Sequence, residues 1–144
     1  MYVITGATGN MGSQFKGDLS FPFIATRDVA AYAAKRLLAL YFKGHNVQYL
    51  LGNRDVSYNE IIRLYGKSID KPELPYVEFS YSDMKDTIVS QWGTSENVAE
   101  MFVEFMEAMN EGQILSDVKR NAESTTPTSI EEFVPVFVQV YSNA

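Results

Sequence analysis

Apolar and polar residues follow one another in blocks whose spacing predicts strands early in the chain and helices later. Short apolar runs at residues 2–5 and 21–24 are typical of buried strands, and the first is ended by Gly6. Residues 46–52 also have a strand-like pattern, and residues 76–81 alternate as a half-exposed strand does. These segments together predict a sheet of short strands.

Two helices are predicted among these strands. Residues 29–42 are rich in Ala and Leu, repeat apolar residues at helical spacing and end near Gly44. Either Thr26 or Asp28 is expected to cap this helix. A second helix is predicted at residues 53–69, where a serine and a glutamate three positions apart form a capping box, namely Ser57 and Glu60.

The second half of the chain is predicted to be mainly helical. One helix is expected at residues 82–92, beginning at Ser82 and ending at Gly93. A second, at residues 95–112, carries an apolar stripe that we expect to face the core, made of Val98, Met101, Phe102, Phe105, Met106 and Met109.

A polar linker is predicted at residues 121–129. Ser129 and Glu132 have capping-box spacing and are expected to start a last helix at residues 130–141, which Pro135 should kink or interrupt.

Length and charge limit the classes of function. The 144 residues are enough for one domain with a single core, so residues 1–144 are expected to form one domain. The net charge of −6 argues against partners such as nucleic acid or an anionic membrane surface. The chain has no cysteine, which excludes disulfides and thiolate catalysis, and its apolar runs are shorter than the roughly 20 residues of a membrane span. A cytoplasmic protein is expected.

A glycine-rich turn follows the first predicted strand. Gly6, Gly9 and Gly12 are spaced G-x-x-G-x-x-G. A turn that brings its backbone close to a pyrophosphate has no room for side chains, and the N–H groups of a following helix attract the anion. This turn therefore predicts a nucleotide-binding site.

The same stretch, VITGATGNMG, resembles the cofactor fingerprint of the NmrA-like branch of the atypical short-chain dehydrogenases. Later segments resemble the second half of such proteins in the same order: FPFIATRDVAAYAAKRLL, YLLGNRDVSYNEI, VEFSYSDMKDTIVSQWGTSENVAEMFVEFMEAMNEG and TPTSIEEFV. They cover most of the chain after residue 20.

The resemblance implies an α/β fold that binds NADP or NAD. A partial, Rossmann-like parallel sheet is expected in residues 1–55 and a mainly helical lobe on the substrate side in residues 56–144. Carried over by position, the cofactor-binding residues are Gly6, Thr8, Gly9, Asn10, Met11 and Gly12.

The chain departs from the family pattern after Gly12. Only residues 13–20 stand where the family has a helix and further strands, and one βαβ unit alone needs about 30 residues. Asp28 lies near the distance at which an acidic residue normally meets the adenosine ribose, but its setting favours a helix cap or an ion-pair partner. Arg27 is interpreted as a surface or packing residue rather than a reader of a 2′-phosphate.

No catalytic residue is predicted. Tyr81 and Lys85 have the spacing of the Tyr and Lys pair in some reductases of this superfamily, but Tyr81 is expected to precede the helix that carries Lys85. His45, the single histidine, is interpreted as a solvated loop residue without metal or triad partners. The aromatic residues Phe79, Tyr81 and Trp92 either line a substrate pocket or pack in the core.

Two classes of function remain open from the sequence. One is an NAD(P)-binding protein related to oxidoreductases that reduce quinones or carbonyls by hydride transfer. The other is a non-catalytic redox-sensing or regulatory protein that binds a protein partner, or an inactive shortened family member. Because a sheet without its middle strands has open edges, a homo-oligomer is expected in either case.

Overall fold

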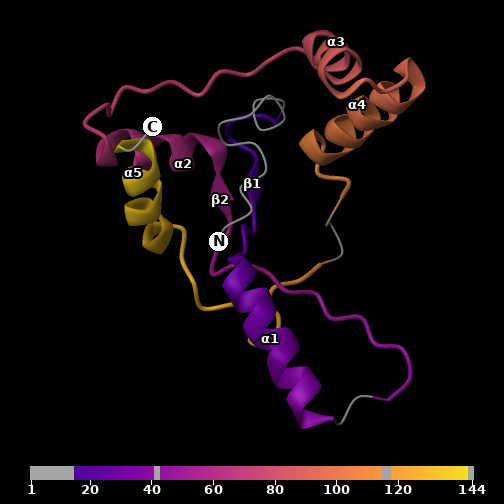
Figure 1. Ribbon diagram of the computed structural model, residues 1–144, viewed down its shortest axis with the longest axis vertical. Helices are drawn as coiled ribbons and strands as arrows, with labels where there is room; N and C mark the ends of the chain where they lie inside the picture. Colours follow the sequence, from indigo (N-terminus) through magenta and orange to yellow (C-terminus); the bar gives the residue numbers. More distant parts are fainter. Residues whose placement is uncertain (1–14, 41–42, 115–117, 143–144) are drawn as a thin grey trace.

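The computed structural model describes residues 15–40, 43–114 and 118–142. The first predicted strand and the glycine turn lie outside these residues. The described elements are shown in Figure 1 and follow in the order β1 (Ser20–Phe21), α1 (Thr26–Ala39), β2 (Val56–Ser57), α2 (Tyr58–Ser68), α3 (Tyr81–Trp92), α4 (Glu96–Asn110), the 3₁₀ turn η2 (Glu131–Phe133) and α5 (Val134–Ser142).

The expected parallel, Rossmann-like sheet is wrong. The described strands form one two-stranded sheet in which β1 and β2 pair antiparallel, with Ser20 opposite Ser57 and Phe21 opposite Val56. Residues 46–52 were expected to add a strand, but Val47 and Tyr49 are 70% and 59% exposed and only Leu51 forms a bridge, parallel to Thr125. Apolar side chains on both faces of a parallel strand need cover, and no strand or helix in the described part of the chain supplies it at residues 46–50.

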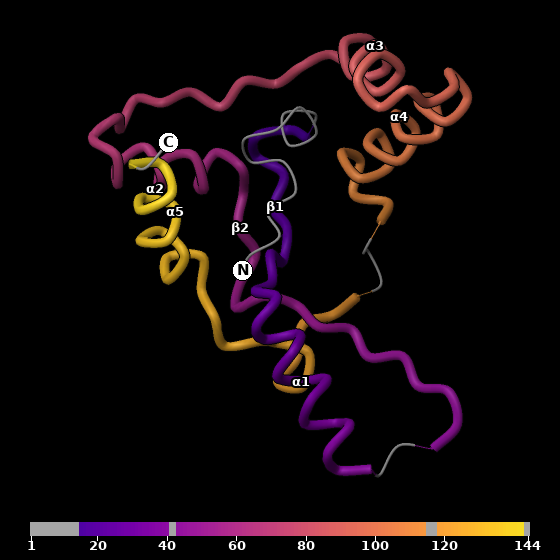
Figure 2. The backbone as a smooth tube through the Cα atoms, viewed as in Figure 1, coloured from indigo at the N-terminus to yellow at the C-terminus, as the bar shows by residue number. Residues whose placement is uncertain are grey.

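Residues 76–81 do not form the expected strand either. Residues 76–80 belong to an extended segment that connects α2 to α3 and crosses the top of Figure 2. Val77 and Phe79 of this segment are exposed, and Tyr81 is already the first residue of α3. Alternation alone therefore did not distinguish a strand from an extended connection.

The helices agree better with the sequence. Ser57 caps α2 by accepting a hydrogen bond from the Glu60 N–H at 3.2 Å, as the capping-box spacing predicted. Helix α3 ends at Gly93, which has the left-handed φ of 64° that glycine tolerates. It begins earlier than expected, because its N-cap is Ser80 rather than Ser82.

The C-terminal helix also starts differently from the expectation. The Ser129 N–H donates to Glu132 at 3.1 Å, but η2 precedes α5. Pro135 is the second residue of α5, where its missing N–H needs no partner, so it does not interrupt the helix.

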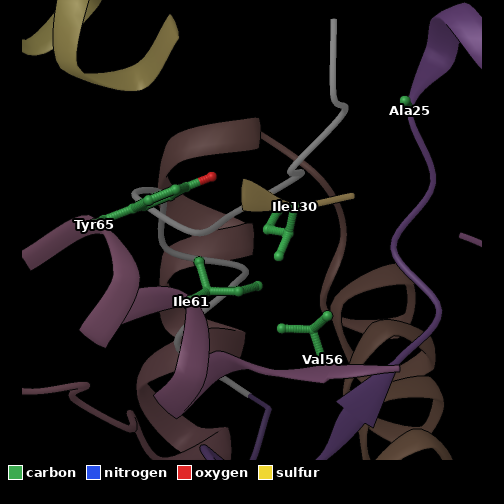
Figure 3. Close-up of a cluster of buried hydrophobic side chains, with 5 residues drawn as sticks. All are labelled: Ala25, Val56, Ile61, Tyr65 and Ile130. Atoms are coloured by element: carbon green, nitrogen blue, oxygen red, sulfur yellow. The ribbon is translucent and has the colours of Figure 1, made fainter. Parts of the chain in front are cut away.

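The buried apolar residues form two clusters. Figure 3 shows the first, in which α2 meets the C-terminal segment and the residue before α1; its members are Ala25, Val56, Ile61, Tyr65 and Ile130. The second joins α3 to α4 through Met84, Ile88, Ala99, Val103 and Met106. Of the stripe expected to be core in α4, Met106 is buried whereas Val98, Met101 and Phe105 are exposed.

An aromatic cluster connects these two regions. The Tyr58 ring stacks on Phe15 and Tyr76 with centroids 5.5 Å away in each case, and Phe21 and Phe23 meet it edge to face. Phe15 also packs against the α3–α4 cluster. Burial raises the pKa of the Tyr58 phenol to about 12, because the phenolate would lose its hydration.

A close backbone contact at Gly52 joins three distant segments. The Gly52 N–H donates to the Pro22 carbonyl at 3.2 Å, while the neighbouring Leu51 exchanges hydrogen bonds with Ser124 and Thr126 at 2.7 and 2.9 Å. A Cβ at residue 52 would lie 1.6 Å from the Phe23 carbonyl oxygen. Only glycine therefore allows this approach.

We expect Gly52→Ala to lower the free energy of unfolding by about 3 kcal/mol, because the methyl group would force two backbone segments apart. Gly44→Ala is the matched control: it adds the same methyl group in open space, at a φ of 66°. It should lower the free energy of unfolding by about 1 kcal/mol or less. Urea unfolding followed by circular dichroism measures both. Equal effects of the two substitutions would contradict the contact at Gly52.

The raised pKa of Tyr58 predicts a loss of stability at alkaline pH. The unfolded chain releases this proton near pH 10 and the folded chain near pH 12, so the free energy of unfolding should fall between these values, by about 3 kcal/mol. Tyr58→Phe removes this part of the pH dependence. Urea midpoints from pH 9 to pH 12 test it, and an unchanged slope in the Phe variant would contradict the burial of the phenol.

Candidate functional site

The predicted cofactor-binding residues lie outside the described residues. Gly6, Thr8, Gly9, Asn10, Met11 and Gly12 all fall in residues 1–14. The described chain begins just after them, at Phe15.

Asp28 is a buried carboxylate that joins the start of α1 to the C-terminal segment. Its two oxygens accept hydrogen bonds from the Thr128 N–H at 3.0 Å and the Thr128 hydroxyl at 2.8 Å. The N-cap of α1 is Ala25, without a side-chain hydrogen bond, so neither Asp28 nor Thr26 caps the helix. The interpretation of Asp28 as a cap or an ion-pair partner is wrong, because Thr128 supplies both donors.

Arg27 lies on the surface and forms two contacts with the same segment. Its Nε donates to the Thr128 hydroxyl at 3.0 Å and its Nη2 lies 2.6 Å from Glu132. Arg27 thus forms an ion pair with Glu132 at the surface, in agreement with its interpretation as a surface residue.

Arg54 forms a second ion-pair group between the start of α2 and η2. Its Nη2 lies 2.6 Å from Glu60 and also pairs with Glu131. Burial alone would raise the pKa of Glu131, but the hydrogen bond and charge of Arg54 outweigh it and hold this pKa below the ordinary value. The hydrogen bonds that Arg54 donates to Glu60 and Glu131 also raise the pKa of Arg54. The group therefore stays charged at neutral pH and serves to hold η2 on α2.

Tyr81 and Lys85 lie in the same helix, contrary to the expectation that Tyr81 precedes it, but their polar atoms contact different residues of α4. The Tyr81 hydroxyl accepts a hydrogen bond from the Asn110 side chain at 2.7 Å, near the end of α4. The Lys85 ammonium lies 2.5 Å from Glu100. This hydrogen bond raises the pKa of Lys85. Glu100 precedes Asn110 by almost three turns of α4. Each side chain is thus engaged in packing α3 against α4.

The remaining sequence candidates are not brought together. His45 is exposed in the loop after α1. Phe79 and Trp92 are also exposed, and the Trp92 ring meets Phe102 edge to face at 5.5 Å. No cluster of His, Asp or Glu among the described residues could hold a metal ion. In the same part of the chain, no helix combines the length and apolar character needed to cross a membrane.

Among the described residues, two of the cavities are candidate binding sites. One, of about 260 Å³, is lined by β1, Leu51, the end of α4 and the ion pair between Arg120 and Asp55. The other, of about 240 Å³, lies between α1 and the C-terminal segment and contains Asp28 and Lys35. Both are smaller than the 300 Å³ or more of a typical pocket for a drug-sized ligand. Each could hold only part of a dinucleotide.

Comparison of the chain with protein-family models, with curated proteins and with solved structures found no match. The resemblance to the NmrA-like proteins therefore stands on its sequence motifs alone.

The buried hydroxyl residues of the C-terminal segment were not predicted from the sequence. Residues 121–129 were interpreted as a linker, yet Ser124, Thr126 and Thr128 are buried. The Thr126 hydroxyl donates to the Leu51 carbonyl at 2.9 Å. Four hydroxyl residues within five positions were the available signal, since Ser and Thr side chains can satisfy buried polar groups.

We expect Thr128→Val to lower the free energy of unfolding by about 2 kcal/mol, because it removes one donor from the buried Asp28 carboxylate. Thr87→Val is the control, since this half-buried threonine of α3 has no side-chain hydrogen bond among the described residues. Its effect should be within about 0.5 kcal/mol of zero. Chemical denaturation of the two variants checks this, and similar losses would show that the Asp28 contact is not important.

Proposed function

We propose that this chain is a nicotinamide-dinucleotide-binding relative of the NmrA-like short-chain dehydrogenases that carries out no hydride transfer of its own. The observation that carries the proposal is the turn of Gly6, Gly9 and Gly12 directly after a predicted strand. Its amides and small residues suit a pyrophosphate of NADP or NAD.

The lack of catalysis is inferred from the reductase-like pair. Tyr81 and Lys85 would have to reach the nicotinamide ribose together, but their polar atoms are engaged by Asn110 and Glu100 at opposite ends of α4. A protein that binds the cofactor and responds to its redox state needs no such pair, so a sensor or regulator fits these contacts better than a reductase.

The proposed binding is weak. A parallel sheet normally supplies the walls around the adenosine, whereas the described strands form only an antiparallel pair and the two described cavities are small. The glycine turn alone would contribute the contacts to the phosphates. Dissociation constants in the micromolar range are therefore expected for both NADPH and NADH.

Calorimetric titration with NADPH and NADH tests the proposal. Gly9→Asp should abolish binding, because a carboxylate in the turn repels the pyrophosphate and occupies its space. Gly44→Asp is the control with the same added charge in a loop glycine with open space around it, and it should bind as the unaltered chain does.

Absence of binding by either dinucleotide, or equal binding by Gly9→Asp, would overturn the cofactor site. Quinone-dependent oxidation of NADPH by the protein, lost in Gly9→Asp, would instead support a reductase and overturn the lack of catalysis.

A further inference from the structure

Helix α1 has an apolar face that nothing in the described chain covers. Figure 1 shows α1 extending away from the other helices. Asp28 is its single buried residue, and Leu38 is 84% exposed. The uncovered apolar positions are Val29, Ala30, Ala33, Ala34, Leu37 and Leu38, with Leu40 directly after them. A helix of 14 residues is marginal in water without such cover, and no described residue supplies it, so this face is a candidate for contact with a partner surface.

The same part of the chain is basic. Residues 29–53 contain Lys35, Arg36 and Lys43 and no carboxylate, although the whole chain has a net charge of −6. Lys35 and Lys43 are exposed. A surface that covers α1 should therefore be apolar with acidic residues at its border.

The described chain contains one such surface, on the outer side of α4. Val98, Met101 and Phe105 are three and four positions apart and form an exposed stripe, in which Met101 is 67% exposed. Glu104, three positions after Met101, is exposed at the edge of this stripe, and Glu107 is exposed one turn further on, beside Glu104. Neither takes part in an ion pair with any described residue. Residues 81–111 contain a single basic residue, Lys85, and seven acidic ones: Asp83, Asp86, Glu96, Glu100, Glu104, Glu107 and Glu111.

These two surfaces cannot meet within one chain. Figure 2 shows α1 at one end of the longest axis and the α3–α4 pair at the other. The apolar face of α1 and the stripe on α4 therefore remain available to a second molecule.

We propose that α1 of one copy packs on the Val98, Met101 and Phe105 stripe of a second copy, and that the contact is made twice in a two-fold symmetric dimer. The lengths match, since helices of 14 and 15 residues are both about 21 to 23 Å long. The charges match as well, because Lys35 and Lys43 of one copy would face Glu104 and Glu107 of the other.

Opposite charge decides between this arrangement and its nearest alternative. Pairing of α1 with α1 of the second copy would also cover the apolar face, but it would bring Lys35, Arg36 and Lys43 of both copies together. The dimer is independent of dinucleotide binding, because neither surface includes the glycine turn.

Sedimentation velocity of the full chain and of charge-reversed variants tests this dimer. At about 50 mM salt, where screening is weak, Lys35→Glu with Lys43→Glu should raise the dimer dissociation constant at least tenfold, and so should Glu104→Lys with Glu107→Lys. An equimolar mixture of the two double variants should form a heterodimer of near-original affinity, because both contacts again join unlike charges. Leu38→Asp should also weaken the dimer.

Matched controls carry the same changes of charge elsewhere. Lys67→Glu and Glu73→Lys alter exposed residues of α2 and of the connection after it, and should leave the dissociation constant within about twofold. Circular dichroism of each variant establishes that it remains folded.

A monomer at all concentrations up to about 100 µM would overturn the proposal. A dimer that the Glu104 and Glu107 reversal leaves unchanged, or a mixture that does not associate, would equally overturn it and favour pairing through α1 alone.

Discussion

The contact between Gly52 and the backbone of residues 22–23 is the constraint on which the arrangement of the chain depends. It brings together the segment before α1, the segment before α2 and, through Leu51, the C-terminal residues 124–126. Each of these segments is irregular, so hydrogen bonds between their backbones replace those that a wider sheet would supply. Arg120 adds to the same point by donating to the Gly52 carbonyl.

The C-terminal segment, residues 124–131, connects the Gly52 contact to the helices. Thr128 satisfies the buried Asp28 carboxylate at the base of α1, and Arg54 holds Glu131 of η2 near the start of α2. Beyond η2, α5 packs on α2, where the Phe137 ring stacks on Tyr65 with centroids 4.2 Å away. Polar contacts thus hold the C-terminal segment in place, and apolar side chains of α5 cover α2.

Local signals in the sequence predicted the helices well because caps and glycines act within a few residues. Ser57 and Gly93 mark helix ends in the structure as they do in the sequence. The strands were predicted poorly, because an apolar run becomes a strand only where a neighbour pairs with it, and no described strand lies beside residues 46–50.

The spacing of residues in the sequence also could not show which residue each side chain contacts. The stripe in α4 has correct helical spacing, but the arc that faces α3 is centred on Ala99, Val103 and Met106 rather than on Met101 and Phe105. Asp28 was expected to act locally, yet its donors come from Thr128, which is 100 residues away. The glycine turn could be singled out by its spacing, whereas the surrounding pocket depends on such distant contacts.

The small sheet explains two features that otherwise look unrelated. In an open α/β sheet, helices cover the faces and the carboxyl ends of the strands form the ligand crevice. The described strands are two, short and antiparallel, so they offer α1 no sheet face to cover and form no crevice of their own for a dinucleotide. The exposed apolar face of α1 and the small cavities therefore share one cause. A second molecule that packs on α1 would cover its apolar face, but it would not by itself enlarge the cavities. Self-association and cofactor binding therefore need not depend on each other in this chain.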